Sequence, residues 1–473
     1  MPIKATTIIS AILIFSPLTF PRMKQKTYEG HYTTNFRLFQ LLKTTFFIEF
    51  ILQICYYNVS EIFGKEDIMK VLIFSATTGG GHMRAANAIK EYIMAKEPNS
   101  VVRIEDTIEY ASPLLNKAVT EGYVYMATKT PRMYGTFYKT IDKGASMNKP
   151  FEIAVKQYRK KFMPMIYDFA PDIIVTTHPI GTEMASAIKV KENINIPIIS
   201  IVTDFAAHQT YVSDGVDAYI VSSAEMIGQM MLRGVDGEKI LPYGIPVKQE
   251  FFKKIDKKEA MESEGLNPDV PTILIMAGSF GVTDVLKVYH KIVKSPCDFQ
   301  IVAITGKNEK LYETFVKYLS KLTLNNTLFE FDLQKPEGFK SSMKLSRHKK
   351  PFKPTKLLYY TNEVEKYMQI ADLIVTKPGG LTVSESIATG LPMGIFKAIP
   401  GQEEQNADYL IRNGMAVRIE KTNQCTQTIT DLLSHPQKLE QMRQSIEKCS
   451  CGNSSEHIYG LMQELIEKYS KKE

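Results

Sequence analysis

Short apolar runs alternate with helix-like stretches along most of the chain. Residues 71–74 (VLIF) form a continuous apolar run, and from Arg84 onward apolar residues recur at roughly helical spacing. A continuous run of this length is typical of a strand that is buried on both faces, as in a parallel sheet. Similar runs follow at 101–110, 171–179, 196–205 and 216–223. Strands of this kind that alternate with helices predict an α/β protein with parallel sheets.

The second half of the chain repeats this pattern. At 271–293 an apolar run enters a turn that contains Gly278 and Gly281, and a helix-like stretch follows. Further strand-like runs lie at 299–308 and 371–380. We therefore predict two doubly wound, Rossmann-like domains, 69–250 and 251–473, that face each other across a cleft. Ligands of open α/β sheets bind at the carboxyl ends of the strands, so the glycine turns are expected to face this cleft.

Three glycines, Gly79, Gly80 and Gly81, lie where the first strand meets the first helix. Glycine permits a positive φ and lets a ligand approach the backbone, and a helix N-terminus offers unpaired N–H groups to an anion. The loop is neither a Walker A motif nor a GxGxxG motif, because no Lys-Ser or Lys-Thr pair follows and the glycine spacing differs. These residues alone leave two interpretations open, a loop that binds a phosphate or an acceptor and a tight turn without a ligand.

The most informative stretch is 371–414. A strand-like run ends in Lys377-Pro378-Gly379-Gly380, and Thr382 and Glu385 fall in the helix that follows. A glycine pair at a helix N-terminus suits a diphosphate, and a carboxylate one turn further on can accept hydrogen bonds from two ribose hydroxyls, as in dinucleotide folds. A loop and helix start downstream carry Gln402, Gln405 and Asn406. No cluster of acidic metal ligands is evident in the sequence.

These motifs resemble the family 28 glycosyltransferases of the GT-B fold, which include the enzyme that adds N-acetylglucosamine to lipid I and the diacylglycerol glycosyltransferases. The stretch 371–414 resembles their donor-binding half. TTGGGHMRAANAI (77–89), VTDFAAHQTYV (202–212) and GIPV (244–247) resemble the lipid branch, namely processive diacylglycerol β-glucosyltransferases and plant monogalactosyldiacylglycerol synthases. The likeness spans about 69–470, apart from a basic insert at 334–356 that departs from the family pattern.

The resemblance implies a role for each matching residue. Glu385 would bind the ribose hydroxyls of a UDP-sugar, and the sugar would be reached by Gln402, Gln405 and Asn406. The phosphates would be lined by Gly278, Ser279, Gly281, Gly379 and Gly380, and the donor would also be bound by Lys377 and Thr382. His82 and Asp204 would serve proton transfer from the acceptor domain beside the Gly79–Gly81 loop, and His208 would support the acceptor site. The residues alone also allow His82 to cap its loop and Asp204 to cap a helix.

The implied reaction transfers a hexose, with glucose expected, from UDP to a hydroxyl of diacylglycerol at the membrane surface. An alcohol is a poor nucleophile, so a base must accept its proton as the new bond forms. A single displacement inverts the anomeric centre and gives a β-glycoside. The UDP-sugar is a substrate rather than a cofactor, and no metal is expected, since backbone N–H groups and Lys377 could stabilise the departing UDP.

Several alternatives stay open at this point. A UDP-galactose-dependent monogalactosyldiacylglycerol synthase differs from a glucosyltransferase by one hydroxyl orientation. A lipid I N-acetylglucosaminyltransferase and a non-hydrolysing UDP-sugar epimerase share the expected architecture. A non-catalytic UDP-sugar-binding protein is the alternative from another class. The sequence also leaves open how many sugars are added.

The net charge of +7 is concentrated in one window. Residues 334–356 hold eight Lys or Arg residues and one Glu, so this window alone accounts for +7. Local basicity indicates a basic patch and argues against a nucleic-acid-binding fold. The insert could add attraction to an acidic membrane or form a disordered loop.

A membrane acceptor implies docking on an anionic membrane surface, and the aromatic and basic segment 123–149 is the predicted contact, with 151–169 beside it. The predicted membrane residues are Lys129, Arg132, Tyr134, Phe137, Tyr138, Lys139 and Lys143. Basic side chains gain about 1 kcal/mol each near anionic lipid, and aromatic side chains favour the interface. We expect a cytoplasmic protein, peripheral on the inner face of the cell membrane. A solvated helix face is the alternative.

Residues 1–68 are predicted to lie outside both domains. The apolar stretch 5–20 resembles the core of a signal peptide, and 45–59 is short for a membrane span and carries Glu49. We interpret the segment as an extension that an upstream translation start would produce, with an uncleaved membrane anchor as the alternative. The five scattered cysteines are expected to be reduced thiols.

Overall fold

The computed structural model describes residues 68–142, 149–276, 284–320, 353–419 and 422–471. These residues belong to one compact unit, Ile68–Glu473. The predicted N-terminal extension, the Gly278–Gly281 turn, Lys143 and most of the basic insert lie outside the described residues. Among the described helices, none combines the length and the apolar character that a membrane crossing requires.

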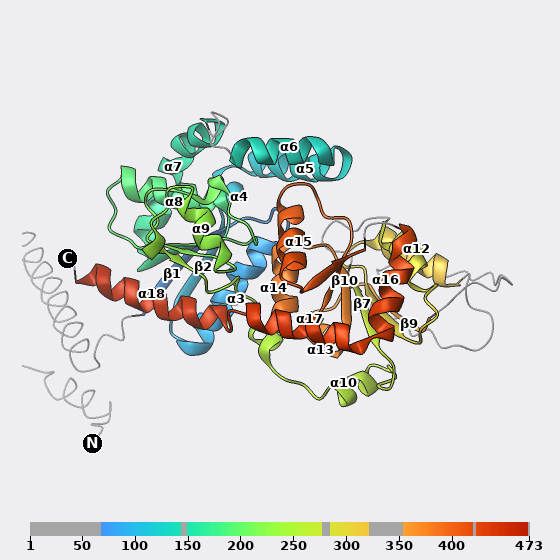
Figure 1. Cartoon of the computed structure of the whole chain (residues 1–473). Coiled ribbons are helices and arrows are strands. Elements are labelled where there is room, and N and C mark those ends of the chain that lie inside the picture. Colours follow the sequence, from blue (N-terminus) through green and yellow to red (C-terminus); the bar gives the residue numbers. More distant parts are fainter. Residues whose placement is uncertain (1–67, 143–148, 277–283, 321–352, 420–421, 472–473) are drawn as a thin grey trace, which may run out of the picture. The chain divides into compact units, whose positions relative to one another are not determined.

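The N-terminal half is built on a six-stranded parallel sheet in the order β2-β1-β3-β4-β5-β6. Figure 1 labels two of its strands, β1 and β2. The apolar run predicted as the first strand is buried from Val71 onward, and Val71 pairs in register with Val102 and Ile173. The strands are β1 (Lys70–Ser75), β2 (Val101–Asp106), β3 (Ile173–Thr176), β4 (Ile198–Ile201), β5 (Ala218–Ile220) and β6 (Ile240–Leu241). The predicted parallel sheet is therefore confirmed.

Helices connect these strands. They are α3 (Gly81–Lys96), α4 (Thr107–Ala111), α5 (Pro113–Lys129), α6 (Pro131–Asp142), α7 (Lys149–Phe169), α8 (Pro179–Lys191) and α9 (Glu225–Met231), with the short 3-10 helices η2 (Gln209–Tyr211) and η3 (Gly237–Lys239). The second strand ends earlier than the predicted run 101–110. Its last residue, Asp106, accepts hydrogen bonds from the N–H groups of Ile108 and Glu109 and so begins α4.

The C-terminal half carries a second six-stranded parallel sheet, in the order β12-β11-β10-β7-β8-β9. Its strands are β7 (Thr272–Met276), β8 (Gln300–Ile304), β9 (Thr355–Leu358), β10 (Leu373–Thr376), β11 (Met393–Ile395) and β12 (Ala416–Arg418). Its helices are η4 (Gln249–Phe252), α10 (Lys257–Ser263), α11 (Asp284–Ile292), α12 (Glu309–Ser320), α13 (Val364–Ile370), α14 (Gly380–Ala388), α15 (Gln402–Arg412), α16 (Thr422–Ser434) and α17 (Pro436–Cys449). Both predicted Rossmann-like units are thus present.

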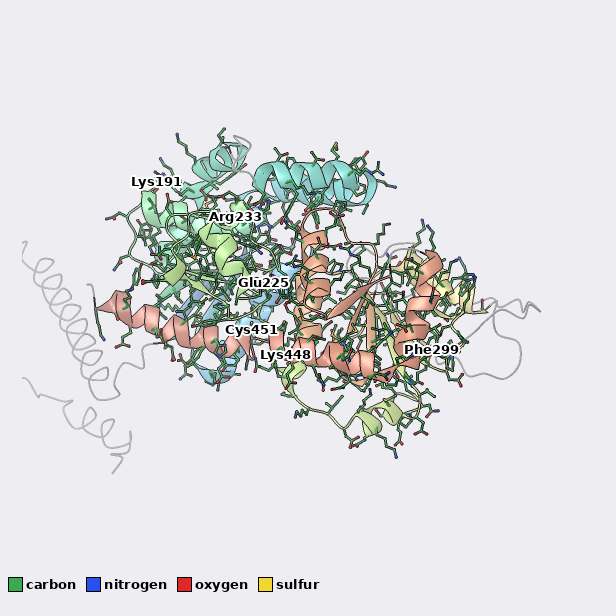
Figure 2. The ribbon with its side chains drawn as sticks, viewed as in Figure 1. Lys191, Glu225, Arg233, Phe299, Lys448 and Cys451 are labelled. Carbon is green, nitrogen blue, oxygen red and sulfur yellow. The ribbon has the colours of Figure 1, made fainter. Side chains whose placement is uncertain are left out.

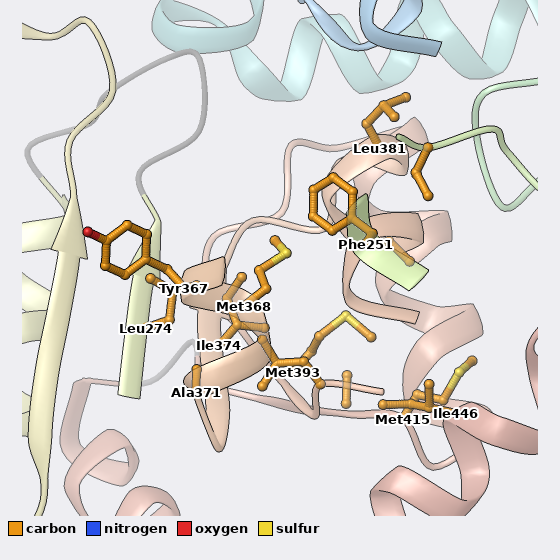
Figure 3. Packing of buried hydrophobic residues seen from close by; sticks show 14 of the residues in the cluster. Phe251, Leu274, Tyr367, Met368, Ala371, Ile374, Leu381, Met393, Met415 and Ile446 are labelled. Atoms are coloured by element: carbon orange, nitrogen blue, oxygen red, sulfur yellow. The ribbon is translucent and has the colours of Figure 1, made fainter. Parts of the chain in front are cut away.

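The core of the C-terminal half lies between its strands and helices, as Figure 3 shows. Leu274, Ile374 and Met393, from three neighbouring strands, are fully buried and belong to one cluster with Tyr367 and Met368 of α13. Burying side chains of this size contributes roughly 1.5–3 kcal/mol each. This packing holds the carboxyl ends of the strands, where the candidate site lies.

The last helix, α18 (Ser454–Ser470), returns to the N-terminal half, which corrects the predicted domain 251–473. Ile458 and Met462 are fully buried in a cluster with residues of β1 and α3. At the far end of α18, the Tyr469 hydroxyl accepts a hydrogen bond from Lys189 Nζ of α8 at 2.7 Å. The apolar stripe of α18 complements the N-terminal sheet, so the C-terminal domain ends near Cys449 and α18 completes the first domain.

Candidate active site

One cavity of about 600 Å³ is lined by residues of both halves. The N-terminal half contributes the glycine turn after β1, His82, His178 and Asp204. The C-terminal half contributes Lys377, Gly379, Gly380, Thr382, Gln402 and Glu403. The cavity therefore brings together most of the predicted catalytic and donor-binding residues.

The glycine turn after β1 adopts the conformation that the sequence suggested. Gly79 and Gly80 have φ angles of 77° and 73°, which L side chains rarely adopt, and α3 begins at Gly81. Among the described residues no side chain caps this helix N-terminus. The first N–H groups of the 16-residue helix α3 thus stand beside the cavity, where they favour negative charge.

His82 is held by backbone and side-chain oxygens. Its Nδ1 lies 2.7 Å from the Thr177 carbonyl oxygen and 2.9 Å from the Thr203 hydroxyl. A carbonyl can only accept, so Nδ1 carries the proton and Nε2 is left as an acceptor. The ring also packs edge-on against His178 at 4.6 Å between centroids. Burial lowers the pKa of His82 to about 4, so the imidazole is neutral at physiological pH.

Asp204 follows β4 and lines the same cavity. Burial raises the pKa of its carboxyl group to about 6, against the opposing effect of a hydrogen bond from Asn406. The Asn406 Nδ2 donates to Oδ1 at 3.2 Å. A carboxyl group with a pKa near the working pH is suited to accept a proton.

His208 serves the geometry of the site. Its Nε2 donates to the Tyr138 carbonyl oxygen at 3.2 Å, and its Nδ1 accepts from the Thr210 N–H at 3.3 Å. The ring stacks on Tyr138 at 4.2 Å. His208 thus holds α6 in place, which fits the expectation of a supporting residue.

Glu385 lies in α14, one turn after Gly380, and is 4% exposed. Its Oε1 accepts a hydrogen bond from Arg84 Nη1 of α3 at 2.8 Å, and its buried Oε2 has no partner among the described residues. Burial raises the pKa of Glu385, and the Arg84 charge opposes this. Sequence reasoning missed Arg84, although its place in the first turn of α3 was a possible signal. Glu385 does not itself line the cavity.

The glycine pair before α14 has two distinct environments. A Cβ at Gly380 would lie 1.9 Å from the Thr203 carbonyl oxygen of the N-terminal half, whereas one at Gly379 would meet nothing within 4 Å. Gly380 is therefore required by the contact between the domains, and Gly379 leaves space in the cavity. Burial raises the pKa of Glu403, and the charge of Lys377, which is buried at the same turn, opposes this rise.

The predicted sugar-binding residues are engaged by the N-terminal half. The Gln402 Oε1 accepts from the Tyr134 hydroxyl at 3.1 Å, and the Gln405 Oε1 accepts from the Tyr138 hydroxyl at 3.4 Å. Asn406 is fully buried. Its Oδ1 accepts from the Phe205 N–H at 2.8 Å, and its Nδ2 donates to the Pro378 carbonyl at 3.0 Å as well as to Asp204. The assignment of Asn406 to the sugar is therefore corrected, because both ends of its amide bind the protein and join the two halves.

The predicted membrane residues divide into two groups. Lys129, Arg132, Phe137 and Lys139 are exposed. Tyr134 is buried and Tyr138 is half-buried, and both line the cavity, so their assignment to the membrane surface is corrected. These two ring positions fall on the inner face of α6.

The C-terminal end of α6 is fixed by an ion pair. Arg233, labelled in Figure 2, donates through Nη2 to Asp142 Oδ2 at 2.8 Å, and the Gln209 N–H donates to Oδ1 at 2.9 Å. The partners hold the pKa of Asp142 below its ordinary value, although burial alone would raise it. The Asp142 ion pair and the His208 contact with Tyr138 together hold the part of α6 that carries Tyr138.

Two family descriptions match this chain. "Monogalactosyldiacylglycerol (MGDG) synthase" matches residues 82–247, and "Glycosyltransferase family 28 C-terminal domain" matches residues 272–457. The boundary between them falls in the segment that links the two sheets.

Three bacterial relatives carry the same name. The "processive diacylglycerol beta-glucosyltransferase" of Bacillus pumilus is 26% identical over 398 residues, which is 84% of this chain and 94% of that protein. The proteins of the same name from Bacillus subtilis and Staphylococcus carnosus are 27% and 28% identical over 82% and 80% of this chain, and the matches cover 93% and 88% of those proteins.

Solved structures share the architecture. MurG of Acinetobacter baumannii superimposes with a TM-score of 0.52 at 15% identity, covering 84% of this chain and 99% of that one. A UDP-GlcNAc 2-epimerase from Neisseria meningitidis, bound to UDP-GlcNAc, gives 0.52 at 15% identity, with 84% and 100% covered. This likeness confirms the predicted two-domain GT-B fold, and the two adjoining family matches place the chain among the family 28 glycosyltransferases, with an N-terminal half of the monogalactosyldiacylglycerol synthase type.

Proposed function

We propose that this protein transfers glucose from UDP-glucose to the free hydroxyl of diacylglycerol and forms a β-glucosyl-diacylglycerol with inversion. The observation that carries the proposal is the single cavity that joins His82 and Asp204 to the turn before α14. The relatives named diacylglycerol glucosyltransferases support the acceptor and the sugar. The match to the galactosyldiacylglycerol synthase description keeps UDP-galactose as the second donor to test.

In the proposed reaction the acceptor oxygen attacks the anomeric carbon while the bond from that carbon to the diphosphate oxygen breaks. Asp204 accepts the hydroxyl proton, because a carboxylate with a pKa of about 6 is a stronger base than an imidazole with a pKa of about 4. The free Nε2 of neutral His82 accepts a hydrogen bond from the same hydroxyl and orients it.

The departing UDP gains negative charge, and the proposal assigns its stabilisation to the chain itself. Lys377 lies at the cavity, and the N-terminus of α3 directs N–H groups toward it. Among the described residues no group of three or more acidic, His or Cys side chains could hold a metal ion. We propose a metal-independent reaction in which Lys377 and these N–H groups stabilise the charge of the departing UDP, so EDTA should change turnover by less than about twofold. Loss of turnover in EDTA that Mg²⁺ restores would contradict this part.

Docking on the inner, anionic face of the cell membrane is also part of the proposal. Lys129, Arg132 and Lys139 are exposed on the α5–α6 hairpin (residues 113–142), where the apolar side chains of Met133 and Phe137 are exposed as well. Basic residues next to exposed apolar groups suit a membrane surface that carries negative charge.

The decisive experiment offers diacylglycerol in anionic vesicles together with each UDP-hexose in turn. We expect a β-glucosyl lipid from UDP-glucose. We expect Asp204→Asn to lower kcat by a factor of about 10²–10⁴ and His82→Ala to lower it about tenfold or more. The exposed His435→Ala serves as the matched control and should retain full turnover. Absence of glycolipid with every UDP-hexose, from a protein that binds UDP, would refute the proposed function.

A further inference from the structure

The part of the cavity wall that α5, α6 and α7 form is mainly apolar. It includes Val119, Tyr123 and Met126 of α5, Ile141 of α6 and Val155 of α7. No charged side chain of α5, α6 or α7 is among the described residues that line it. A nucleotide diphosphate sugar offers little apolar surface to such a wall, so the wall fits a different part of the reaction.

One small residue of this apolar region is Gly122. It lies in the interior of α5, lines the cavity, and has no left-handed φ. Glycine in a helix interior is less stable than alanine by roughly 0.5–1 kcal/mol. A Cβ at this position would meet nothing within 4 Å, so neither the packing nor the backbone requires glycine. Ala118, one turn earlier, also lines the cavity. What these small residues provide is space.

The apolar region reaches the exposed face of the hairpin. Phe137 lines the cavity and is 36% exposed. Met133 lies one turn before it on α6 and is 57% exposed, and Tyr125 of α5 is 60% exposed. The exposed basic residues Lys129 and Arg132 lie in the same hairpin. Phe137 thus joins the cavity wall to a surface of the hairpin that carries further exposed apolar side chains and positive charge.

We infer that this apolar region, with Gly122 in its wall, is a binding site for one acyl chain of the lipid acceptor, which enters past Phe137. The inference rests on the proposed function. It adds where the acyl chain binds and which residue, Gly122, leaves space for it. An acyl chain seated here directs its glycerol end toward His82 and Asp204, which line the same cavity. Each buried methylene changes affinity by about fourfold, so a side chain that fills the site should select strongly against long chains.

The first test fills the site with Gly122→Phe and compares dioleoylglycerol with dihexanoylglycerol as acceptors. We expect kcat/KM for the long acceptor to fall at least tenfold, kcat/KM for the short acceptor to stay within about threefold, and the UDP Kd to stay unchanged. Thr128→Phe, which alters an exposed position of α5 that does not line the cavity, should change none of these values. An unchanged ratio of long to short acceptor in a folded Gly122→Phe protein would overturn the inference.

The second test does not depend on turnover. The natural chain contains no tryptophan, so Ala118→Trp creates a single fluorescent reporter at the cavity. We expect diacylglycerol with brominated acyl chains, at a few mole per cent in otherwise unbrominated vesicles, to quench this reporter with saturation. Thr128→Trp should be quenched only in proportion to the bromine content of the bilayer. Identical quenching of the two reporters would refute the acyl site, even if the transferase reaction is confirmed. If the wild-type protein shows no transferase activity while the Ala118→Trp reporter is still quenched with saturation, the proposed reaction is refuted and the lipid site is kept.

Discussion

Replacing Gly380 by alanine should separate the two domains without unfolding either. The added Cβ would lie 1.9 Å from the Thr203 carbonyl oxygen, whereas real Cβ atoms essentially never approach closer than 3.0 Å. The N-terminus of α14 must therefore move by about 1.1 Å from the end of β4, which is the difference between these two distances. The backbone fixes the position of a Cβ, and the Thr203 oxygen is itself a backbone atom, so no side-chain rotation can relieve the overlap.

The energetic cost follows from the kind of clash. Overpacking of this type typically costs about 1–3 kcal/mol, which corresponds to a shift of roughly 5- to 150-fold away from the closed arrangement. Catalysis needs residues of both halves, so we expect kcat to fall by a factor in that range. The thermal midpoint should change little, because opening of the cleft relieves the strain.

Gly379→Ala is the matched control. Gly379 has a φ of −71°, which alanine adopts freely, and its Cβ would meet nothing within 4 Å. Solution scattering should show a larger radius of gyration for Gly380→Ala only, while Gly379→Ala keeps the closed dimensions. Gly379→Ala should weaken UDP binding, because the added methyl group fills space in the cavity. Wild-type turnover and dimensions in Gly380→Ala would refute the reasoning.

Four further predictions concern charge. Arg84→Ala should weaken UDP binding more at pH 5 than at pH 8, because the pKa of buried Glu385 rises when the opposing cation is lost. Calorimetry in which Arg84→Ala and the wild type show the same pH dependence of UDP binding would contradict this. Turnover should rise through pH 6 as Asp204 ionises. The pKa of Asp204 in the folded protein, about 6, exceeds its ordinary value of 3.8, so the stability present below pH 3.8 is lost as pH rises through 6. Asp204→Asn should therefore raise the Tm at pH 7.5, and a lower Tm would count against this reasoning. Neutralising the three exposed cations Lys129, Arg132 and Lys139 should weaken binding to anionic vesicles by up to about 10²-fold at low salt and leave UDP binding intact. Unchanged sedimentation with vesicles would contradict the docking surface.

The strands and the glycine turns could be predicted because they depend on local pattern. The run 71–74 is buried as expected for a parallel strand, and Gly79 and Gly80 take positive φ at the strand-to-helix turn. Periodicity also placed Glu385 one turn into a helix that a glycine pair begins. Each of these features is determined within a few residues of sequence.

The remaining features depend on contacts between distant parts of the chain. The Arg84–Glu385 ion pair joins residues 301 positions apart, and Asn406 binds the Phe205 N–H across 201 positions. Aromatic and basic residues at 123–149 suggested one membrane face, yet Tyr134 lies on the inner side of α6. Composition gives no direction to a side chain until the partner element is known.

The return of α18 has a consequence for the order in which the protein folds. The N-terminal sheet is completed by a helix that follows the entire C-terminal domain in sequence, so a ribosome finishes the first domain only after it has made the second. At about 5–20 residues per second, the apolar surface that Ile458 and Met462 will cover stays open for many seconds after β6 has been made. The nascent chain therefore exposes this surface while the second domain is already folding, and chaperone binding during synthesis should concentrate there.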